Sequence, residues 1–342
     1  MSETDFIYIS SKIRVLESKI LNDNDIDRMV NSTDLEKAFK VLNDTDYSDN
    51  LLGLRAEDYR EALVRDLQEM NDFLQKTTPS QDLFRLMTMP KDFMNLRLLF
   101  KSYFFNVDVD HIIKNNPTYN PKRSRDLPFE NHINYPEAMK EYIHGDKRQT
   151  LDEDMKEVIQ NTIKSLSNKS RPDEVDSFLT HQYYALSLKI AKRIKSDFII
   201  DYFKMSIDVA NLIILFRSPR LQLEREKVKE KLIPGGRIDI SKMIHFYPDD
   251  FPGLKPYINA YFDSEIVEDF NRFCESKGIF QIERLLQKHK ADYIKKVKYK
   301  NYGADVVFAY YLFKIRASYN VGIILTGKLN HVPSEEIRKT IR

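Results

Sequence analysis

The residue types that most often carry catalysis or hold metals are scattered in this chain of 342 residues. Its seven histidines never stand three or four positions apart, the spacing that places two imidazoles on one helix face to bind zinc. The sequence also has no Gly-rich phosphate loop, no HExxH and no CxxC. The single cysteine, Cys274, excludes an internal disulfide and fits a buried thiol in a reducing compartment. We therefore predict that the protein is not an enzyme and binds no cofactor or metal.

An acidic segment, Asp23 to Asp27, begins like the loop of a calcium-binding EF-hand. Such a loop normally has glycine at its sixth position and glutamate at its twelfth, where this chain has Arg28 and Asp34. The sequence therefore argues against a calcium site. Other acids nearby are typical of helix ends and turns: Asp44, Asp46 and Asp49.

A basic tract interleaved with tyrosines lies between Lys288 and Lys300 and could offer phosphate contacts beside stacking rings. Nucleic-acid-binding domains usually carry a marked basic excess, whereas 54 basic and 52 acidic residues give this chain a formal net charge of only +2. A solvated helix face explains the tract more simply, and contact with an acidic protein is a further alternative. A helical nucleic-acid-binding protein is thus the alternative function, and our main prediction includes no nucleic acid.

Helices are predicted to position these residues. Glycine is scarce, at 9 residues, and few stretches alternate with the period of a strand. Apolar residues recur at helical spacing in these segments: 13–21, 59–73, 151–166, 175–194, 198–216, 266–274, 279–289 and 304–325. A further helix is predicted after a capping box, with Thr33 as the N-cap and Glu36 at N3. The predicted fold class is all-α.

The sequence offers no segment for membrane insertion or secretion. The apolar runs 210–216 and 306–313 are far shorter than the roughly 20 residues that a membrane helix needs. The N-terminal sequence MSETDFIYISS is acidic at its start and lacks the basic and apolar regions of a signal peptide. These features predict a cytoplasmic protein.

One helix-plus-turn segment occurs three times, beginning at Asn95, Asn211 and Asn320. The copies read NLRLLFKSYFFNVDVDHI, NLIILFRSPRLQLEREKV and NVGIILTGKLNHVPSEEI. Counted from the asparagine, apolar residues at +1, +4 and +5 share one helix face, and the acid at +15 lies in the first turn of a following helix. The asparagines either line a central depression or tie each helix to a neighbouring backbone, the second being the simpler interpretation.

The interval between the copies is far longer than the repeat of a solenoid, so each copy is expected to be a small helical domain. The predicted domains are residues 1–117, 118–235 and 236–342. Stretches rich in proline or glycine, at 115–128 and 233–256, agree with these boundaries.

Several segments together resemble the C subunit of prokaryotic A/V-type ATP synthases, the counterpart of the d subunit of vacuolar ATPases. They are FIYISSKIRVLESKIL, STDLEKAFKVLNDTDY, the three repeated copies, and the ending NVGIILTGKLNHVPSEEIRKTIR. The resemblance covers the whole chain and depends on the order and spacing of these segments, since each alone is mainly a pattern of helix packing. It implies three similar helical domains in a pseudo-threefold arrangement around a central depression.

The resemblance also implies a function. The protein would be a noncatalytic central-stalk subunit, a socket that joins the axle heterodimer of D and F subunits to the membrane rotor ring. It would transmit torque between ATP synthesis or hydrolysis and the transport of ions, either hydrogen ions or sodium ions. It would lie on the cytoplasmic face and associate with the membrane only through the ring.

Basic residues near the end of each repeated helix are the predicted partner contacts. Arg97 keeps the basic residue that the family has two positions after the asparagine, and the other two copies lack it. Lys101 and Arg217 stand at +6, while the third copy has Lys328 nearby. The last three could instead complement the dipole of the helix C-terminus.

Overall fold

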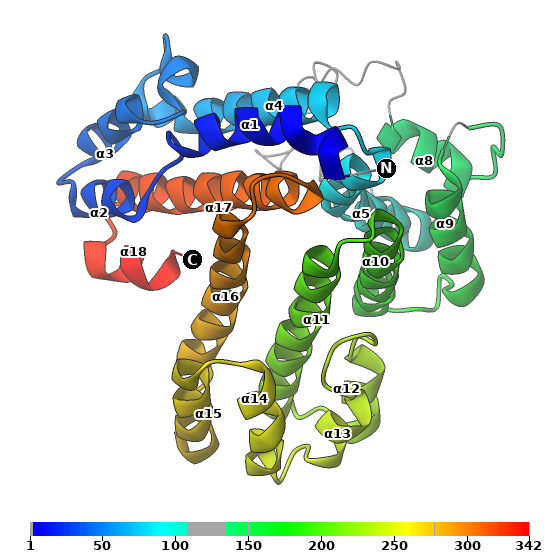
Figure 1. Cartoon of the computed structure of the whole chain (residues 1–342). Coiled ribbons are helices and arrows are strands. Elements are labelled where there is room, and N and C mark those ends of the chain that lie inside the picture. Colours follow the sequence, from blue (N-terminus) through cyan, green and yellow to red (C-terminus); the bar gives the residue numbers. More distant parts are fainter. Residues whose placement is uncertain (1–2, 108–134, 150, 277, 342) are drawn as a thin grey trace. The chain divides into compact units, whose positions relative to one another are not determined.

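A computed structural model describes the chain except for residues 1–2, 108–134, 150, 277 and 342 (Figure 1). The α-helices are α1 (Ile7–Glu17), α2 (Asp23–Asn31), α3 (Leu35–Val41), α4 (Tyr59–Thr77), α5 (Gln81–Phe105), α8 (Tyr135–Ile143), α9 (Glu153–Ser165), α10 (Pro172–Ile194), α11 (Asp197–Arg217), α12 (Arg225–Lys231), α13 (Ile240–His245), α14 (Lys255–Tyr261), α15 (Ser264–Ser276), α16 (Phe280–Lys295), α17 (Ala304–Leu329) and α18 (Ser334–Thr340). Short 3-10 helices are η1 (Glu3–Phe6), η2 (Leu42–Asp44), η3 (Ser48–Leu51), η4 (Ala56–Asp58), η5 (Ser218–Leu221), η6 (Phe251–Leu254) and η7 (Lys296–Tyr299). No strand occurs in the described part of the chain, and the predicted all-α class is confirmed.

The chain forms two compact units, each built from segments that are far apart in the sequence. Unit 1 contains Met1–Phe84, Ser196–Tyr202 and Phe262–Arg342, and unit 2 contains Arg85–Lys195 and Phe203–Tyr261. The division into three domains with pseudo-threefold symmetry stays a prediction. Its first proposed boundary stretch, 115–128, lies outside the described residues, and the second, 233–256, carries α13 and η6.

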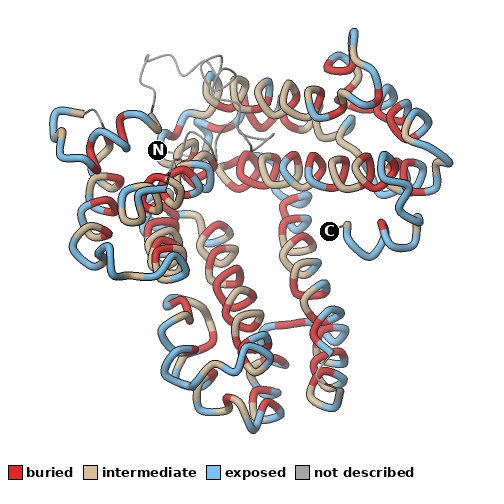
Figure 2. The backbone as a smooth tube through the Cα atoms, turned by 180° about the vertical axis from the view of Figure 1, so that it is seen from behind, coloured by how far each residue is buried: buried red, intermediate tan, exposed pale blue. Residues whose placement is uncertain are grey.

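The long helix α17 is the centre of unit 1. It packs beside α4, α1 and α3, and its C-terminal part also contacts α2 and α18 (Figure 1). Figure 2 shows buried positions along the whole of this helix. Three of its side chains, Val321, Ile324 and Leu325, are fully buried in a core that residues of α2, α3 and α4 complete. Each such side chain contributes about 1.5–3 kcal/mol through removal from water.

Aromatic and polar contacts hold the helices of unit 2 together. The ring of Tyr183 on α10 lies 5.4 Å from that of Phe93 on α5 and 6.5 Å from that of Phe203 on α11, both edge to face. The buried carboxylate of Asp208 on α11 accepts hydrogen bonds from the backbone N–H groups of Arg237, at 3.1 Å, and Ile238, at 3.0 Å. The stretch that follows α12 is therefore anchored to α11.

The positions of the helices were predicted correctly from the sequence, but the end of one helix and the N-cap of another were not. All eight predicted segments overlap helices. One of them extends too far, because it places residues 18–21 in a helix, whereas α1 ends at Glu17. The predicted N-cap Thr33 is wrong by one position, because Asp34 is the N-cap and its carboxylate accepts from the N–H of Lys37 at 2.8 Å. A carboxylate is the stronger acceptor, and Thr33 itself donates to it at 2.7 Å.

The EF-hand-like segment is helical. Asp23 begins α2, and the side chain of Asn22 caps this helix by accepting from the N–H groups of Asn24 and Asp25. Asp25 accepts in return from the N–H of Asn22, which completes a capping box. The acids at the start of α2 thus stabilise a helix N-terminus.

Candidate partner-contact sites

The three repeated segments share one backbone turn. Each asparagine lies on a long helix, and the residue at +11 has a left-handed backbone in every copy: φ is 53° at Asn106, 51° at Gln222 and 56° at His331. None of these residues is glycine, the residue that normally marks such a turn. The same geometry at the same offset shows that the repetition in sequence is a repetition in structure.

Hydrogen bonding repeats as well in the second and third copies. The N–H at +12 donates to the carbonyl oxygen at +7, from Leu223 to Ser218 at 3.2 Å and from Val332 to Gly327 at 2.9 Å. This bond is the mark of a Schellman motif, which closes a helix and turns the chain into the next element.

The apolar face of the repeat is buried as predicted. All nine side chains at +1, +4 and +5 are buried: Leu96, Leu99, Phe100, Leu212, Leu215, Phe216, Val321, Ile324 and Leu325. The acids at +15 lie in the first turns of α12 and α18, which confirms the prediction for Glu226 and Glu335. The corresponding positions of the first copy, Asp110 and Ile112, lie outside the described residues.

The repeated asparagines are buried but not equivalent. Asn211 is fully buried, and its side chain donates to the carbonyl oxygen of Ile233 at 2.8 Å and accepts from its N–H at 2.7 Å. The side-chain oxygen of Asn95 is buried without a hydrogen-bond partner. For the second copy, the interpretation of the asparagine as a tie to a neighbouring backbone is therefore confirmed.

Two of the four predicted contact residues lie between helices of unit 2. Arg97 and Lys101 are one turn apart on α5, and they meet Thr180 and Asp176 of α10 at 3.2 and 2.7 Å. Both side chains are half-buried, and their hydrogen bonds to α10 join that helix to α5. Their role in binding a partner stays a prediction.

The other two predicted contact residues differ sharply in exposure. Lys328 is buried, and its ammonium group donates to the carbonyl oxygen of Ser32 at 2.7 Å and to the hydroxyl of Ser334 at 3.0 Å. Burial lowers the pKa of Lys328. Arg217 lies exposed at the end of α11. Of the four residues, Arg217 is thus the one that the fold leaves at the surface.

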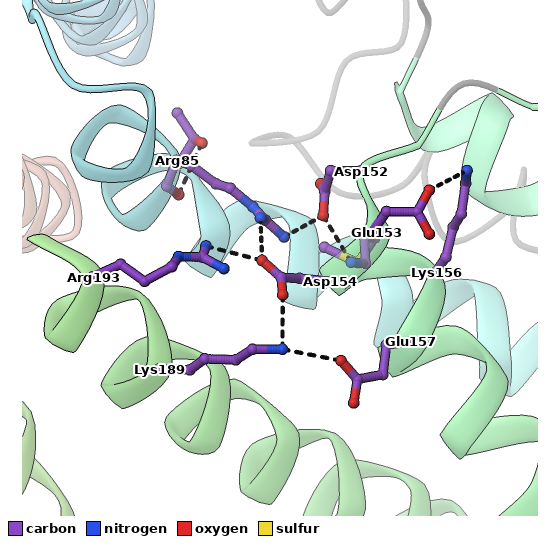
Figure 3. Close-up of polar contacts among 10 residues, drawn as sticks. Arg85, Asp152, Glu153, Asp154, Lys156, Glu157, Lys189 and Arg193 are labelled. Atoms are coloured by element: carbon purple, nitrogen blue, oxygen red, sulfur yellow. Dashed lines mark hydrogen bonds and ion pairs between the residues drawn. The ribbon is translucent and has the colours of Figure 1, made fainter.

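A charge network that the sequence analysis missed joins three helices of unit 2 (Figure 3). The carboxylate of Asp154, near the start of α9, accepts from Arg85 of α5 at 2.6 Å. It also accepts from Lys189 and Arg193 of α10, both at 2.9 Å. Burial opposes the ionised form of Asp154, but the hydrogen bonds from the three cations outweigh it and hold its pKa well below the usual range. Asp152, the N-cap of α9, completes the network by accepting from Arg85.

Replacing Asp154 with asparagine is expected to lower the free energy of unfolding by about 1–2 kcal/mol, because three cations lose a shared partner that is itself poorly exposed. The value is modest because Lys189 and Arg193 are 51% and 38% exposed and therefore screened by water. Urea denaturation measures the change. Glu153→Gln is the matched control, since that carboxylate is 88% exposed and pairs only with Lys156 in Figure 3. Equal losses in the two variants would contradict the assignment.

The basic tract is largely engaged within the protein. Three ion pairs join it to acids: Lys288 to Glu265 at 2.6 Å, Lys295 to Asp292 at 2.9 Å, and Lys300 to Asp305. Lys296 lies over the ring of Tyr293 at 4.9 Å, and the hydroxyl of Tyr293 donates to the backbone of Phe198. These contacts support the interpretation of the tract as a solvated helix face.

The described residues include no group of three or more His, Cys, Asp or Glu side chains that could hold a metal ion. Within the same residues, no helix combines the length and apolar character that crossing a membrane requires.

Comparison with known proteins places the chain in a family. The family model of the ATP synthase (C/AC39) subunit matches residues 9–340. The chain is 25% identical over 298 residues to the C subunit of the A-type ATP synthase of Thermococcus kodakarensis, covering 84% of this chain and 76% of that protein. It is 20% identical over 371 residues to the C subunit of the A-type ATP synthase of Methanocaldococcus jannaschii, covering 98% and 86%. It is 16% identical over 330 residues to the C subunit of the V-type sodium ATPase of Enterococcus hirae, covering 96% of both chains. Since the match runs through nearly the whole chain and includes all three asparagine-anchored helices, the protein belongs to the ATP synthase (C/AC39) subunit family.

Proposed function

We propose that this protein is a noncatalytic central-stalk subunit of a rotary A/V-type ATPase. It acts as a socket between the axle heterodimer of D and F subunits and the membrane rotor ring, and it transmits torque between them. The family match over residues 9–340, with relatives named as the C subunits of A-type ATP synthases and of a V-type sodium ATPase, carries the proposal. In this role the protein lies on the cytoplasmic face of the membrane and is attached to it only through the ring.

The internal construction suits an element that must bear torque. Closely packed helices transmit strain because protein interiors have low compressibility. Charged ties between helices, such as the network around Asp154 in unit 2, resist sliding of one helix past another. Contacts with the axle are expected to be broad, with charged groups that set the register rather than one dominant side chain.

Arg217 is our proposed direct contact with the axle, because it is exposed, whereas Arg97, Lys101 and Lys328 are half-buried or buried within their own units. A charge at the edge of such an interface steers association and disfavours a wrong register. The other three residues are then expected to act indirectly, by keeping the repeated helices in place.

A pull-down of the purified D and F heterodimer by the tagged chain tests the proposal. The unaltered chain is expected to retain the heterodimer, and Arg217→Glu is expected to raise the dissociation constant about tenfold, the effect of roughly 1.4 kcal/mol. Lys242→Glu, an exposed lysine of α13 with the same change in charge, serves as the control and should bind normally. Failure of the unaltered chain to bind, or ATP hydrolysis by the isolated chain, would overturn the proposed function.

A further inference from the structure

A charged cluster lies inside unit 1, where α17 passes α4 and the turn between η2 and η3. The ammonium group of Lys314, whose side chain is 3% exposed, donates to the carboxylate of Asp46 at 2.7 Å and to that of Asp66. Asp66 on α4 is equally enclosed, with a side chain 4% exposed. The ring of Tyr47, also fully buried, lies 4.9 Å from the same ammonium group. Groups nearly 270 residues apart in sequence thus share one polar site, which is buried at Lys314 and Asp66 and 13% exposed at the side chain of Asp46.

The charges in this cluster do not balance. Two carboxylates face one ammonium group, and Glu69 of α4 adds further negative potential at Asp66. Burial, together with the negative charge of the two carboxylates, also raises the pKa of the phenols of Tyr47 and Tyr310. Glu17 of α1 adds to the effect on the pKa of Tyr310. A net negative charge in a buried site of low dielectric constant is costly.

Hydrogen bonding in the cluster is incomplete as well. Three buried oxygen atoms have no partner in good hydrogen-bond geometry, namely Asp46 Oδ1, Asp66 Oδ2 and Tyr47 Oη, although the Tyr47 hydroxyl lies close enough to Asp66 and Ser318 to interact with both. The two carboxylate oxygens can only accept while both groups are ionised, and Lys314 already serves the other oxygen of each. A proton bound to one carboxylate would turn an acceptor into a donor and remove the excess charge at the same time.

We propose that the Asp46–Asp66 pair holds a single exchangeable proton, which makes the cluster a proton-binding switch that tightens unit 1 when the surrounding solution becomes more acidic. With the proton bound, one ammonium group balances one carboxylate. When the proton leaves, the negative charges repel each other across the contact between α4, α17 and the turn at Asp46. The proposal is independent of the proposed function, since it concerns the interior of unit 1.

The direction of the pKa shift of Asp66 is the one that this geometry favours. Burial raises the pKa of Asp66 to about 6, although Lys314 opposes the change. A carboxyl group with a raised folded-state pKa binds a proton on folding, so its stabilising effect is complete below the unfolded value of 3.8 and is lost as the pH rises through about 6. Between pH 5 and pH 8 this single shift changes the opening equilibrium about tenfold.

Hydrogen exchange on the full chain tests the switch, with rates corrected for the intrinsic effect of pH. In the unaltered protein, amides of α4 and of residues 42–54 are expected to lose protection about tenfold between pH 5 and pH 8. Asp66→Asn mimics the protonated group and does not titrate, so its protection should be nearly independent of pH. Asp208→Asn is the control, because it removes another buried carboxyl group, with a pKa raised to about 6 by burial, from unit 2. It should leave the pH dependence in unit 1 unchanged.

A direct titration covers the case in which Asp66→Asn does not fold. Carbon NMR of aspartate carboxyl groups should show a resonance titrating near pH 6 that persists in Asp208→Asn, which removes the other aspartate expected near pH 6, and that is shifted or lost in Asp46→Asn. The switch is overturned if protection in unit 1 is flat with pH in the unaltered protein, if Asp66→Asn keeps the same pH dependence, or if every aspartate of unit 1 titrates below about pH 4.5.

Discussion

Lys314→Met is expected to lower the free energy of unfolding by about 3–5 kcal/mol at pH 8, the usual cost of removing one partner from a buried ion pair. Methionine fills a similar volume, so the loss comes from the two carboxylates of Asp46 and Asp66, which are left facing each other without a cation. Urea denaturation at pH 8 measures it. At pH 5 the loss should be smaller, because protonation of Asp66 removes part of the repulsion.

A combined variant separates charge from packing in this experiment. Lys314→Met together with Asp46→Asn and Asp66→Asn leaves no charge in the cluster, and it is expected to recover at least half of the lost stability. If the combined variant were as unstable as Lys314→Met alone, the loss would come from packing around α17, and the electrostatic explanation would be wrong.

Asn211→Leu is expected to lower the free energy of unfolding by about 2–4 kcal/mol, since it leaves both the N–H and the carbonyl oxygen of Ile233 buried without a partner. Leucine has the branching of asparagine but larger methyl groups, so part of the loss comes from overpacking, which the matched change in the first copy also carries. The second copy of the repeat thus depends on a polar contact inside an otherwise apolar surface.

The first copy supplies the control. Asn95→Leu changes the same residue at the same repeat position, but the side-chain oxygen of Asn95 has no hydrogen bond to lose. Its cost is expected to be clearly smaller than that of Asn211→Leu in parallel thermal and urea denaturation. Equal costs would show that the asparagine matters through its helix rather than through Ile233.

The predictions that the structure confirms were based on sequence patterns within single helices. The burial of the +1, +4 and +5 positions follows from the helical period alone, and Glu226 and Glu335 follow from the preference of acids for a helix N-terminus. The sequence analysis did not predict a left-handed backbone at +11, because none of the residues there is glycine. These residues are Asn106, Gln222 and His331, and their identical offset is visible when the three copies are aligned.

Polar contacts between residues far apart in the chain could not be predicted from the sequence. Asp46 was interpreted as a helix-end or turn residue, and it does lie on a turn, but the turn is buried against α17. Arg85 and Asp154 are 69 positions apart and look like ordinary surface charges until α5 and α9 pack together. The repeat predicted a contact role for Lys328 and for Arg217 alike. Only the packing of the helices shows that Lys328 is buried and Arg217 is exposed.

The position of α17 in unit 1 has a consequence for synthesis on the ribosome. The helices α1 to α4 leave the ribosome first, but the helix against which they pack begins only at Ala304. At the usual 5–20 residues per second, the intervening stretch of on the order of two hundred residues takes about 10 to 40 s to translate. During that delay the apolar faces of the early helices lack their final neighbour, so the nascent chain is expected to need a chaperone until its last helices emerge.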